Sequence, residues 1–469
     1  MQIGKWVVVA VLCFIGCLEV SASHVITEIP VGGIVISAPG TYVFGNNITW
    51  SPDGDGQAIL IESSDVTLDM QNFTLESTIT TFNTTGILAT LAKNLIIKNG
   101  TIVNMGLGGI KCDVCENILV QNIVVDGLNL EDVVTYTVPT GILITASINA
   151  TVDKCTVKNI DVKTGSTAGI QFTETVSSTV SNCLVKNLLN RDGACTGIGH
   201  LLCDAVVVKS CTVNNLKSEF IDNLNTEGHT AIGIIPVTST NILIKDCTVL
   251  NITGCCDDAH GMSLFECLNV LVKKCRVKNV VDGAGAAQTG AKATGIEVYA
   301  SNVKVVECSV RNITAINPQS KQAAGFSCAE CDGVKFIKCH AQNVNVVDEN
   351  GNQNSALGYG VGYGWAPDPR PEFVVPAVNV LYKQCTAREC QVGFDSWFHI
   401  DSLWTHIHSV CNGVSILDLD KSQRTLSCNA CSECGCISAG CYPEPRTITI
   451  ENVAKNNRFT HVKAKYCNK

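Results

Sequence analysis

Three consecutive passes of one short pattern, between Gly233 and Thr314, constrain the fold of this chain most strongly. Each pass begins with a glycine and a short apolar run. An asparagine then opens an alternating strand, a cysteine follows, and a second asparagine closes the pass. The offsets between these four markers are eight, six and four residues, and the markers are Gly233, Asn241, Cys247 and Asn251 in one pass and Gly261, Asn269, Cys275 and Asn279 in the next. A repeat this regular indicates one structural unit stacked on itself.

The runs between the markers are rich in Val and Ile with period-two alternation, which is typical of β-strands too short to be stable alone. Their apolar sides must therefore pack against the coils above and below. Asn suits a tight bend, because it tolerates the left-handed backbone region and can hydrogen-bond to the equivalent Asn one coil away. Two Asn columns and the loop before each glycine supply three bends per coil. We therefore expect an all-β fold, a right-handed single-stranded parallel β-helix: a three-sided solenoid of about eleven coils, rising about 4.8 Å per coil.

The chain divides into three regions. Residues 1–23 have a lysine, an apolar run at 6–16 and small residues at 20–23, which together predict a secretory signal peptide too short to span a bilayer. A lipoprotein signal cut before Cys17 is the alternative, although Phe14 fits it poorly. Residues 24–410 are expected to form the β-helix, and the Cys-rich segment 411–469 to cap its open end. We expect the mature chain to be secreted or held at the extracellular surface.

The start of the β-helix carries a family resemblance. Pro39, Gly40, Thr41 and Tyr42, followed by a strand of Val66, Thr67, Leu68 and Asp69, resemble the opening of right-handed β-helix proteins of the pectin-lyase-like superfamily. The resemblance implies the fold. It implies little about activity, because that superfamily contains lyases, hydrolases, adhesins and phage spikes.

Net charge and the placement of the loops limit the classes of partner that the chain can bind. A net charge of -9 without a basic cluster argues against nucleic acid. Insertions fall almost wholly between the second Asn of a coil and the next glycine, so one corner carries the loops, and such a corner usually lines the binding side. We expect a glycan or a surface protein as partner, no membrane span and no cofactor.

Cysteines recur at fixed repeat positions. One column, expected to form a ladder of buried thiols because a step of about 4.8 Å is too long for a disulfide, contains Cys155, Cys183, Cys211, Cys247, Cys275, Cys308, Cys339 and Cys385. The asparagine ladders are expected to pair Asn241 with Asn269 and Asn251 with Asn279. A second cysteine column contains Cys115, Cys203, Cys267 and Cys331, and Cys112 and Cys328 complete two CxxC pairs that permit a disulfide or a metal.

The tail differs from the repeat, because five cysteines fall within fourteen residues: Cys428, Cys431, Cys434, Cys436 and Cys441. A zinc cluster uses such spacing, but disulfides are the commoner outcome after export and are favoured here. The mature chain has an odd number of cysteines, which leaves a disulfide-linked oligomer open.

The best candidates for catalysis are Asp257, Asp258 and His260, in the variable corner just before a strand. The preceding coil offers Asn225, Glu227 and His229. Paired carboxylates with a nearby His can hydrolyse a glycosidic bond, one acid protonating the leaving oxygen while the other activates water. The order of these residues resembles the polygalacturonase motifs, but Glu227 stands where that family has Asp, and the His follows the two Asp almost at once.

Two other chemistries have weaker support. A lyase needs Asp-bound calcium and a base on one face, but the outward positions two residues after each glycine contain no acid cluster: Lys111, Leu143, Gln171, Gly199, Ile235, Ser263, Glu297 and Ser327. His399, His406 and His408 with Asp401 offer metal-ligand types, yet packing beside Trp397 and Trp404 is the favoured interpretation, so no metal site is predicted.

The sequence therefore predicts an exported, non-catalytic β-helix whose loop-bearing face recognises a glycan or another surface. A carbohydrate-active enzyme, a hydrolase before a lyase, is the first alternative. A disulfide-linked structural coat component is the second.

Overall fold

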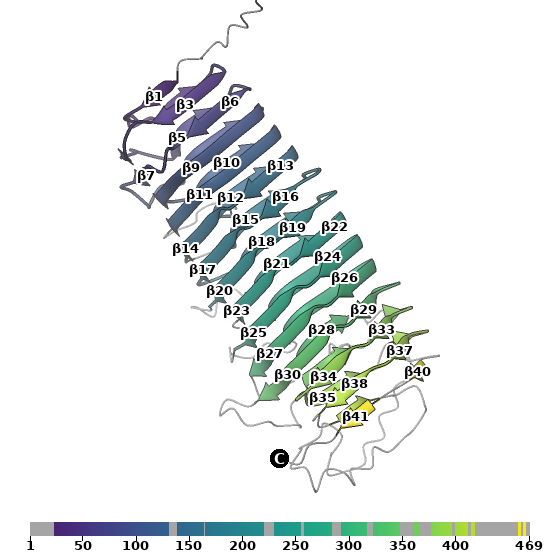
Figure 1. Cartoon of the computed structure of the whole chain (residues 1–469). Helices are drawn as coiled ribbons and strands as arrows, with labels where there is room; N and C mark the ends of the chain where they lie inside the picture. The colour runs from purple at the N-terminus through teal and green to yellow at the C-terminus, as the bar shows by residue number, and fades with distance from the viewer. Residues whose placement is uncertain are drawn as a thin grey trace, which may run out of the picture.

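The structure is a computed structural model that describes residues 23–130, 138–163, 165–219, 229–254, 258–283, 292–316, 322–347, 360–364, 377–395, 399–410, 414–417, 458–460 and 463–465. These residues form an elongated stack of coils with strands on three faces (Figure 1). Adjacent coils pair in parallel, so that β14 (Thr156–Val162), β17 (Leu184–Asn190) and β20 (Thr212–Ser218) are successive neighbours of one sheet. The expected all-β parallel solenoid is confirmed.

The first face carries the coil glycines, and we call it the glycine face. Its strands are β2 (Ile34–Ile36), β5 (Gly56–Ile61), β8 (Thr84–Thr90), β10 (Gly108–Asp113), β12 (Thr140–Thr145), β15 (Thr167–Thr173), β18 (Cys195–Leu201), β21 (Ala231–Val237), β28 (Gln322–Cys328), β31 (Gly360–Gly364), β35 (Val392–Asp395) and β39 (Val414–Leu417). Strands β2, β5, β31, β35 and β39 extend it beyond the regular repeats, so the solenoid has more coils than the eleven or so expected.

The second face follows the first Asn column. Its strands are β1 (His24–Ile26), β3 (Gly40–Phe44), β6 (Val66–Asp69), β13 (Ile148–Asp153), β16 (Thr179–Ser181), β19 (Val207–Lys209), β22 (Thr240–Lys245), β29 (Lys335–Ile337), β33 (Leu381–Lys383), β37 (Leu403–Thr405) and β40 (Arg458–Thr460). A small separate sheet pairs β32 (Ala377–Val378) with β36 (His399–Ile400).

The third face follows the cysteine ladder. Besides β14, β17 and β20, it contains β4 (Ile48–Trp50), β7 (Thr74–Ser77), β23 (Thr248–Gly254), β25 (Arg276–Asp282), β27 (Ser309–Ile316), β30 (His340–Val347), β34 (Thr386–Arg388), β38 (His408–Val410) and β41 (Lys463–Lys465).

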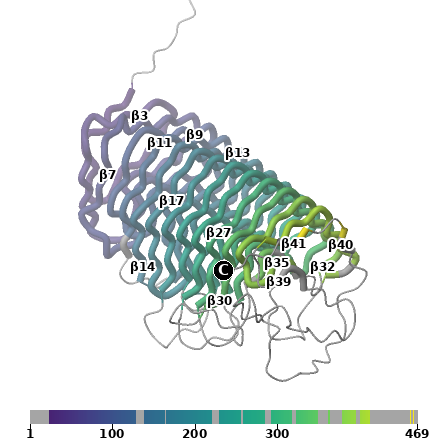
Figure 2. Tube along the Cα trace, turned by 60° about the horizontal axis from the view of Figure 1, so that its bottom comes forward, coloured from purple at the N-terminus to yellow at the C-terminus, as the bar shows by residue number. Residues whose placement is uncertain are grey.

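Four longer strands run round a corner and serve two faces: β9 (Lys93–Met105), β11 (Glu116–Leu130), β24 (Asp258–Lys273) and β26 (Lys292–Val306). Strand β24, for example, pairs with both β21 and β22. Figure 2 shows how the coils turn through the same corners one after another.

The core is a stack of inward Ile, Val, Leu, Ala and Cys side chains. The coil glycines let the chain pack tightly around it. A Cβ built on Gly233 would lie 2.4 Å from Val249 Cγ1 and 2.5 Å from the carbonyl oxygen of Gly261 in the next coil. Any side chain at this position would therefore push the coils apart.

The two predicted terminal regions lie largely outside the described residues. This applies to residues 1–22 of the predicted signal peptide and to most of the predicted cap. Within 411–469, the described strands β39, β40 and β41 pair in parallel with β35, β37 and β38, so they continue the stack. The described part of the chain contains no helix able to cross a membrane.

Candidate functional site

The outward side of the glycine face brings together residues from many coils in fixed rows. Along each strand, inward core residues such as Ile296 and Val298 alternate with outward ones such as Glu297 and Tyr299. Because the register is continuous, outward residues at the same distance from each coil glycine line up along the long axis. The corner where the loops are inserted borders this face, at the start of each of its strands.

A cavity of about 460 Å³ opens on this face over β8, β10, β12, β15 and β18. Its wall consists mainly of hydroxyl, small and aliphatic side chains, including Thr140, Leu143, Thr173 and Leu201. Lys111 and Gln171 supply the longer polar groups, and no carboxylate is among the lining residues that the structure describes. A concave, largely apolar site with a few placed polar groups is typical of small-ligand binding.

One outward row extends from this cavity along the face. Leu201, which lines the cavity, pairs in register with Val237; Val237 pairs with Phe265, and Phe265 with Tyr299. Leu201 is 37% exposed and Phe265 41% exposed. The rings of Phe265 and Tyr299 are 5.8 Å apart and tilted by 48°. The row thus offers a partly exposed apolar track, about 14 Å long at about 4.8 Å per step.

A polar cluster lies beside the aromatic end of the row, on β24 and β26. His260 Nε2 lies 3.4 Å from Asp258 Oδ2, and His260 Nδ1 lies 3.2 Å from Glu297 Oε2. Lys292 Nζ lies 2.9 Å from Glu297 Oε1 and donates to the hydroxyl of Tyr299 at 3.1 Å. These five residues form what we call the β24–β26 cluster.

Two further hydrogen bonds fix the cluster to its strands. The Lys292 backbone N–H donates to Asp258 Oδ1 at 2.9 Å, and the Ser263 hydroxyl donates to Glu297 Oε2 at 3.2 Å. Glu297 is only 3% exposed, whereas the Asp258 side chain is 29% exposed. A ligand on this face can therefore reach Asp258 but not the carboxylate of Glu297.

Mutual charge sets the protonation of the cluster. Burial alone would raise the pKa of Asp258, but the hydrogen bond from His260 and the charge of Lys292 outweigh it, and the pKa is lowered. Burial alone would lower the pKa of His260, but the Glu297 and Asp258 carboxylates outweigh it, and the pKa is raised. The cluster thus favours the ionised form of Asp258 and the protonated form of His260.

The same balance acts on the two residues next to Glu297. Burial alone would lower the pKa of Lys292, but the carboxylate of Glu297 outweighs this and holds the pKa well above its usual value. Burial raises the pKa of Tyr299, and the cation of Lys292 offsets this only in part. Both side chains keep their protons at neutral pH.

The predicted catalytic residues are only partly brought together. Asp258 and His260 are in contact, whereas Asp257 lies outside the described residues, as do Asn225 and Glu227 of the preceding coil. His229 is described and lies 3.6 Å from Asp192. The partners of Asp258 and His260 instead come from the following coil, as Lys292, Glu297 and Tyr299.

Those partners were missed although a signal for them exists. Asp258 and Lys292 each precede a coil glycine by three residues, and Ser263 and Glu297 each follow one by two. Aligning the coils on Gly261 and Gly295 places Asp258 opposite Lys292 and Ser263 opposite Glu297, which is their register in the structure.

The asparagine columns form hydrogen-bonded ladders. Asn269 Nδ2 donates to Asn241 Oδ1 at 3.2 Å, and Asn279 Nδ2 donates to Asn251 Oδ1 at 2.8 Å. All four residues have φ between 55° and 60°. Each ladder therefore satisfies side-chain amides at a corner that needs the left-handed backbone.

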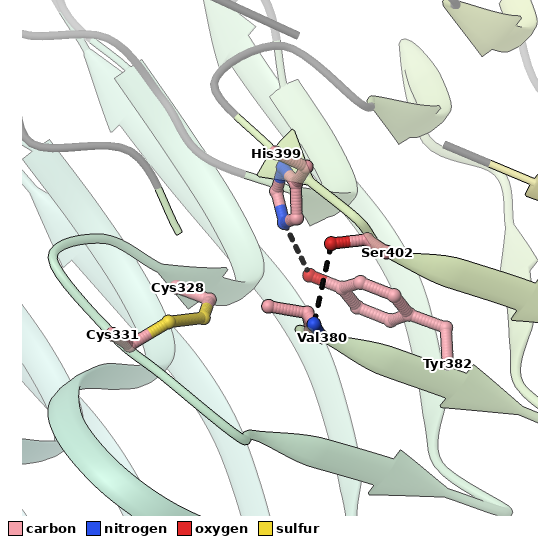
Figure 3. The surroundings of a disulfide bond; sticks show 6 residues. All are labelled: Cys328, Cys331, Val380, Tyr382, His399 and Ser402. Carbon is pink, nitrogen blue, oxygen red and sulfur yellow. Dashed lines mark hydrogen bonds between the residues drawn. A yellow bond between two sulfur atoms is a disulfide. The ribbon is translucent and has the colours of Figure 1, made fainter. Parts of the chain in front are cut away.

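The cysteine columns are buried. All eight thiols of the predicted ladder, Cys247 and Cys275 among them, are free in the structure. In the second column Cys115, Cys203 and Cys267 are also free, whereas Cys331 forms a disulfide with Cys328 (Figure 3). The five tail cysteines lie outside the described residues.

The histidines near the C-terminus do not gather. His399 is buried and its Nε2 lies 3.0 Å from the hydroxyl of Tyr382 (Figure 3), while His406 Nδ1 lies 2.8 Å from the hydroxyl of Thr405. Across the described ranges, no three His, Cys, Asp or Glu side chains are placed to hold a metal ion.

Comparison with known proteins gives one family match and several distant structural ones. Residues 32–233 match the family described as right handed beta helix region. No curated protein sequence matches the chain.

Among solved structures, the chain is similar to a tailspike protein of E. coli bacteriophage HK620 in complex with a pentasaccharide, with 14% identity over 82% of this chain and 71% of that one and a TM-score of 0.45. It is also similar to the periplasmic alginate epimerase AlgG, with 10% identity over 94% and 85% and a TM-score of 0.38. A third match is the catalytic domain of a GH87 alpha-1,3-glucanase in complex with nigerose, with 12% identity over 76% of this chain and a TM-score of 0.42. The chain spans only 60% of that domain.

Proposed function

We propose that this right-handed parallel β-helix protein, whose fold is the one that the resemblance to the pectin-lyase-like superfamily predicted, is exported and binds a linear glycan along its glycine face. The observation that carries the proposal is the cavity over β8 to β18. Its volume lies in the range of pockets that bind small ligands. A stable protein partner would instead need about 800 Å² of matched surface on each side.

The chemistry of the face favours a saccharide. Sugar rings present apolar faces and hydroxyl edges, and the site offers both kinds of contact. The row from Leu201 to Phe265 and Tyr299 provides apolar and aromatic surface. Lys111 and Gln171 in the cavity provide hydrogen-bonding groups for hydroxyls. Lys111 makes no ion pair with the residues that the structure describes, so its ammonium is available to a ligand.

Binding without catalysis is favoured by the charges of the β24–β26 cluster. Glycoside hydrolysis needs one carboxyl group that stays protonated until it donates to the leaving oxygen. Asp258, the carboxyl that a ligand can reach, has a lowered pKa, and Glu297 is buried between Lys292 and His260. Hydrolysis through Asp258 remains the alternative function.

The test begins with a glycan array probed with the mature chain, followed by calorimetry on the best ligand. Lys111→Ala and Gln171→Ala should each weaken binding by about fivefold to tenfold, as expected for loss of one hydrogen bond. Lys209→Ala is the matched control, because Lys209 is exposed on β19 of the second face. Equal affinity of all variants would contradict the proposed site.

Incubation of the same ligand with the wild-type chain, followed by measurement of reducing ends, separates binding from hydrolysis. We expect no release. Release that is lost in Asp258→Asn would establish the hydrolase alternative.

A further inference from the structure

The two CxxC pairs of the chain occupy the same place in their coils. Cys112 and Cys115 follow Gly109 by three and six residues, and Cys328 and Cys331 follow Gly325 by the same offsets. Both pairs flank the corner between the glycine face and the second face. They differ in the structure, because Cys328 and Cys331 are bonded and Cys112 and Cys115 are free.

The local backbone at the two corners is alike. The residue before the second cysteine has a left-handed conformation in both, with φ of 54° at Val114 and 49° at Glu330. The first cysteine is fully buried in both pairs and the second is 3% exposed in both. At the bonded corner the Cα atoms are 6.4 Å apart, within the range that a disulfide spans. The likeness of the two corners predicts a similar Cα separation for Cys112 and Cys115.

Other cysteines of the second column show what a thiol does there when it has no partner. Cys203 and Cys267 have His200 and Leu264 three residues earlier, so neither belongs to a CxxC pair. Their Sγ atoms lie 3.2 Å from the carbonyl oxygens of Leu201 and Phe265, two residues earlier. Cys115 Sγ makes the same contact with the Asp113 carbonyl oxygen at 3.3 Å, as an unbonded thiol at this position does.

We propose that Cys112 and Cys115 form a second corner disulfide when the chain folds in an oxidising compartment. A thiolate of one cysteine attacks the S–S bond of a protein or peptide disulfide that acts as oxidant. The other cysteine then attacks the resulting mixed disulfide. The Cys112–Cys115 bond forms, and the oxidant leaves as two thiols carrying the protons.

The timing of closure follows from burial. Burial raises the pKa of both Cys112 and Cys115, which disfavours the attacking thiolate once the coil has formed. Closure therefore belongs to the folding stage, before this corner is covered. The bond would fix the turn directly after β10, the strand whose Lys111 lines the cavity.

The test is to secrete the full chain from a host with an oxidising export pathway, denature it in N-ethylmaleimide without reductant, digest it and read each cysteine by mass spectrometry. We expect the peptide with Cys112 and Cys115 to be unalkylated and lighter by two hydrogens, as for Cys328 and Cys331. Cys203 and Cys267 serve as internal controls and should be alkylated.

A Cys115→Ser variant should leave Cys112 alkylated, which shows that Cys115 and no other cysteine is its partner. Alkylation of both Cys112 and Cys115 in wild-type chains whose Cys328–Cys331 bond is closed would overturn the proposal. Alkylation of all four would overturn it as well, because the two corners would then share no tendency to oxidise.

Discussion

At the residue scale, a few side chains perform tasks that no other residue type performs equally well. Asn251 and Asn279 adopt the left-handed backbone and hydrogen-bond to each other, and Asn312 extends the same ladder by donating to Asn279 at 2.9 Å. Each rung thus combines a conformational preference with a side-chain hydrogen bond. Because neighbouring rungs share residues, loss of one Asn breaks two hydrogen bonds.

Replacing Asn279 separates these two contributions. Asn279→Ala should lower the free energy of unfolding by about 2 kcal/mol, since Ala is strained at a φ of 59° and both hydrogen bonds are lost. Asn279→Gly should cost about 1 kcal/mol less than Asn279→Ala, because glycine tolerates the backbone. Thermal unfolding of both variants measures the difference, and equal losses would show that the backbone preference contributes nothing.

The ion pairs of His260 make stability depend on pH. The pKa of His260 is raised in the folded state. The stability that its ion pairs contribute is therefore fully present below the unfolded-state pKa near 6.5, and it is lost as pH rises through the higher folded-state pKa. Asp258 has a lowered pKa, so its contribution is lost only as pH falls below about 4.

The wild type should therefore have a higher melting temperature than His260→Gln, which lacks the titrating group. This difference should be larger at pH 5.5 than at pH 8.5. The measurement is a series of melting curves over that pH range. A constant difference between the two proteins across the range would show that the ion pairs to Asp258 and Glu297 do not contribute.

At the element scale, packing depends on how each strand meets the coil that follows it. The sequence predicted the spacing of these strands well, because Gly, Asn and Cys recur at fixed offsets. It also showed Asn302 one residue early, and the structure explains why: Phe265 pairs with Tyr299 and Cys267 with Ala300, so Glu266 is an extra residue in β24. This bulge restores the register that places Asn302 Nδ2 2.6 Å from Asn269 Oδ1.

The coil glycines give a prediction about strand packing. Gly233→Ala should destabilise the protein by about 2 kcal/mol, since the new methyl group would clash with Val249 and with the carbonyl of Gly261. A second change, Val249→Ala, should recover only part of this loss, because the backbone carbonyl remains in place. Full recovery in the double variant, measured by thermal unfolding, would show that the side-chain clash is the whole effect.

At the scale of the whole molecule, the solenoid converts sequence spacing into rows of side chains along one axis. The fold was predictable because the central coils repeat the same markers. The site was less predictable, because Asp258 meets Lys292, and His260 meets Glu297, across a loop of variable length. Only an alignment on the coil glycines brings them into register. Such an alignment also joins the cavity at Leu201 to the aromatic pair at Phe265 and Tyr299.

This continuity predicts how affinity depends on ligand length. From β8 to β26 the face extends about 34 Å at about 4.8 Å per coil, so a short saccharide fills the cavity alone and a longer one also reaches Phe265. Affinity should therefore rise with the number of sugar units and then level off. Phe265→Ala should weaken binding of long saccharides by about tenfold and leave short ones unchanged, since an aromatic contact contributes about 1 kcal/mol.

Leu268→Ala is the matched control for this variant, because Leu268 is similarly exposed on β24 but lies past the corner, in register with Thr240 at the start of the second face. Calorimetry with a graded series of saccharides measures each affinity. If Phe265→Ala weakened short and long saccharides equally, the ring would act on the cavity and not as a separate contact. If it weakened neither, the ligand would not lie along the axis of the solenoid.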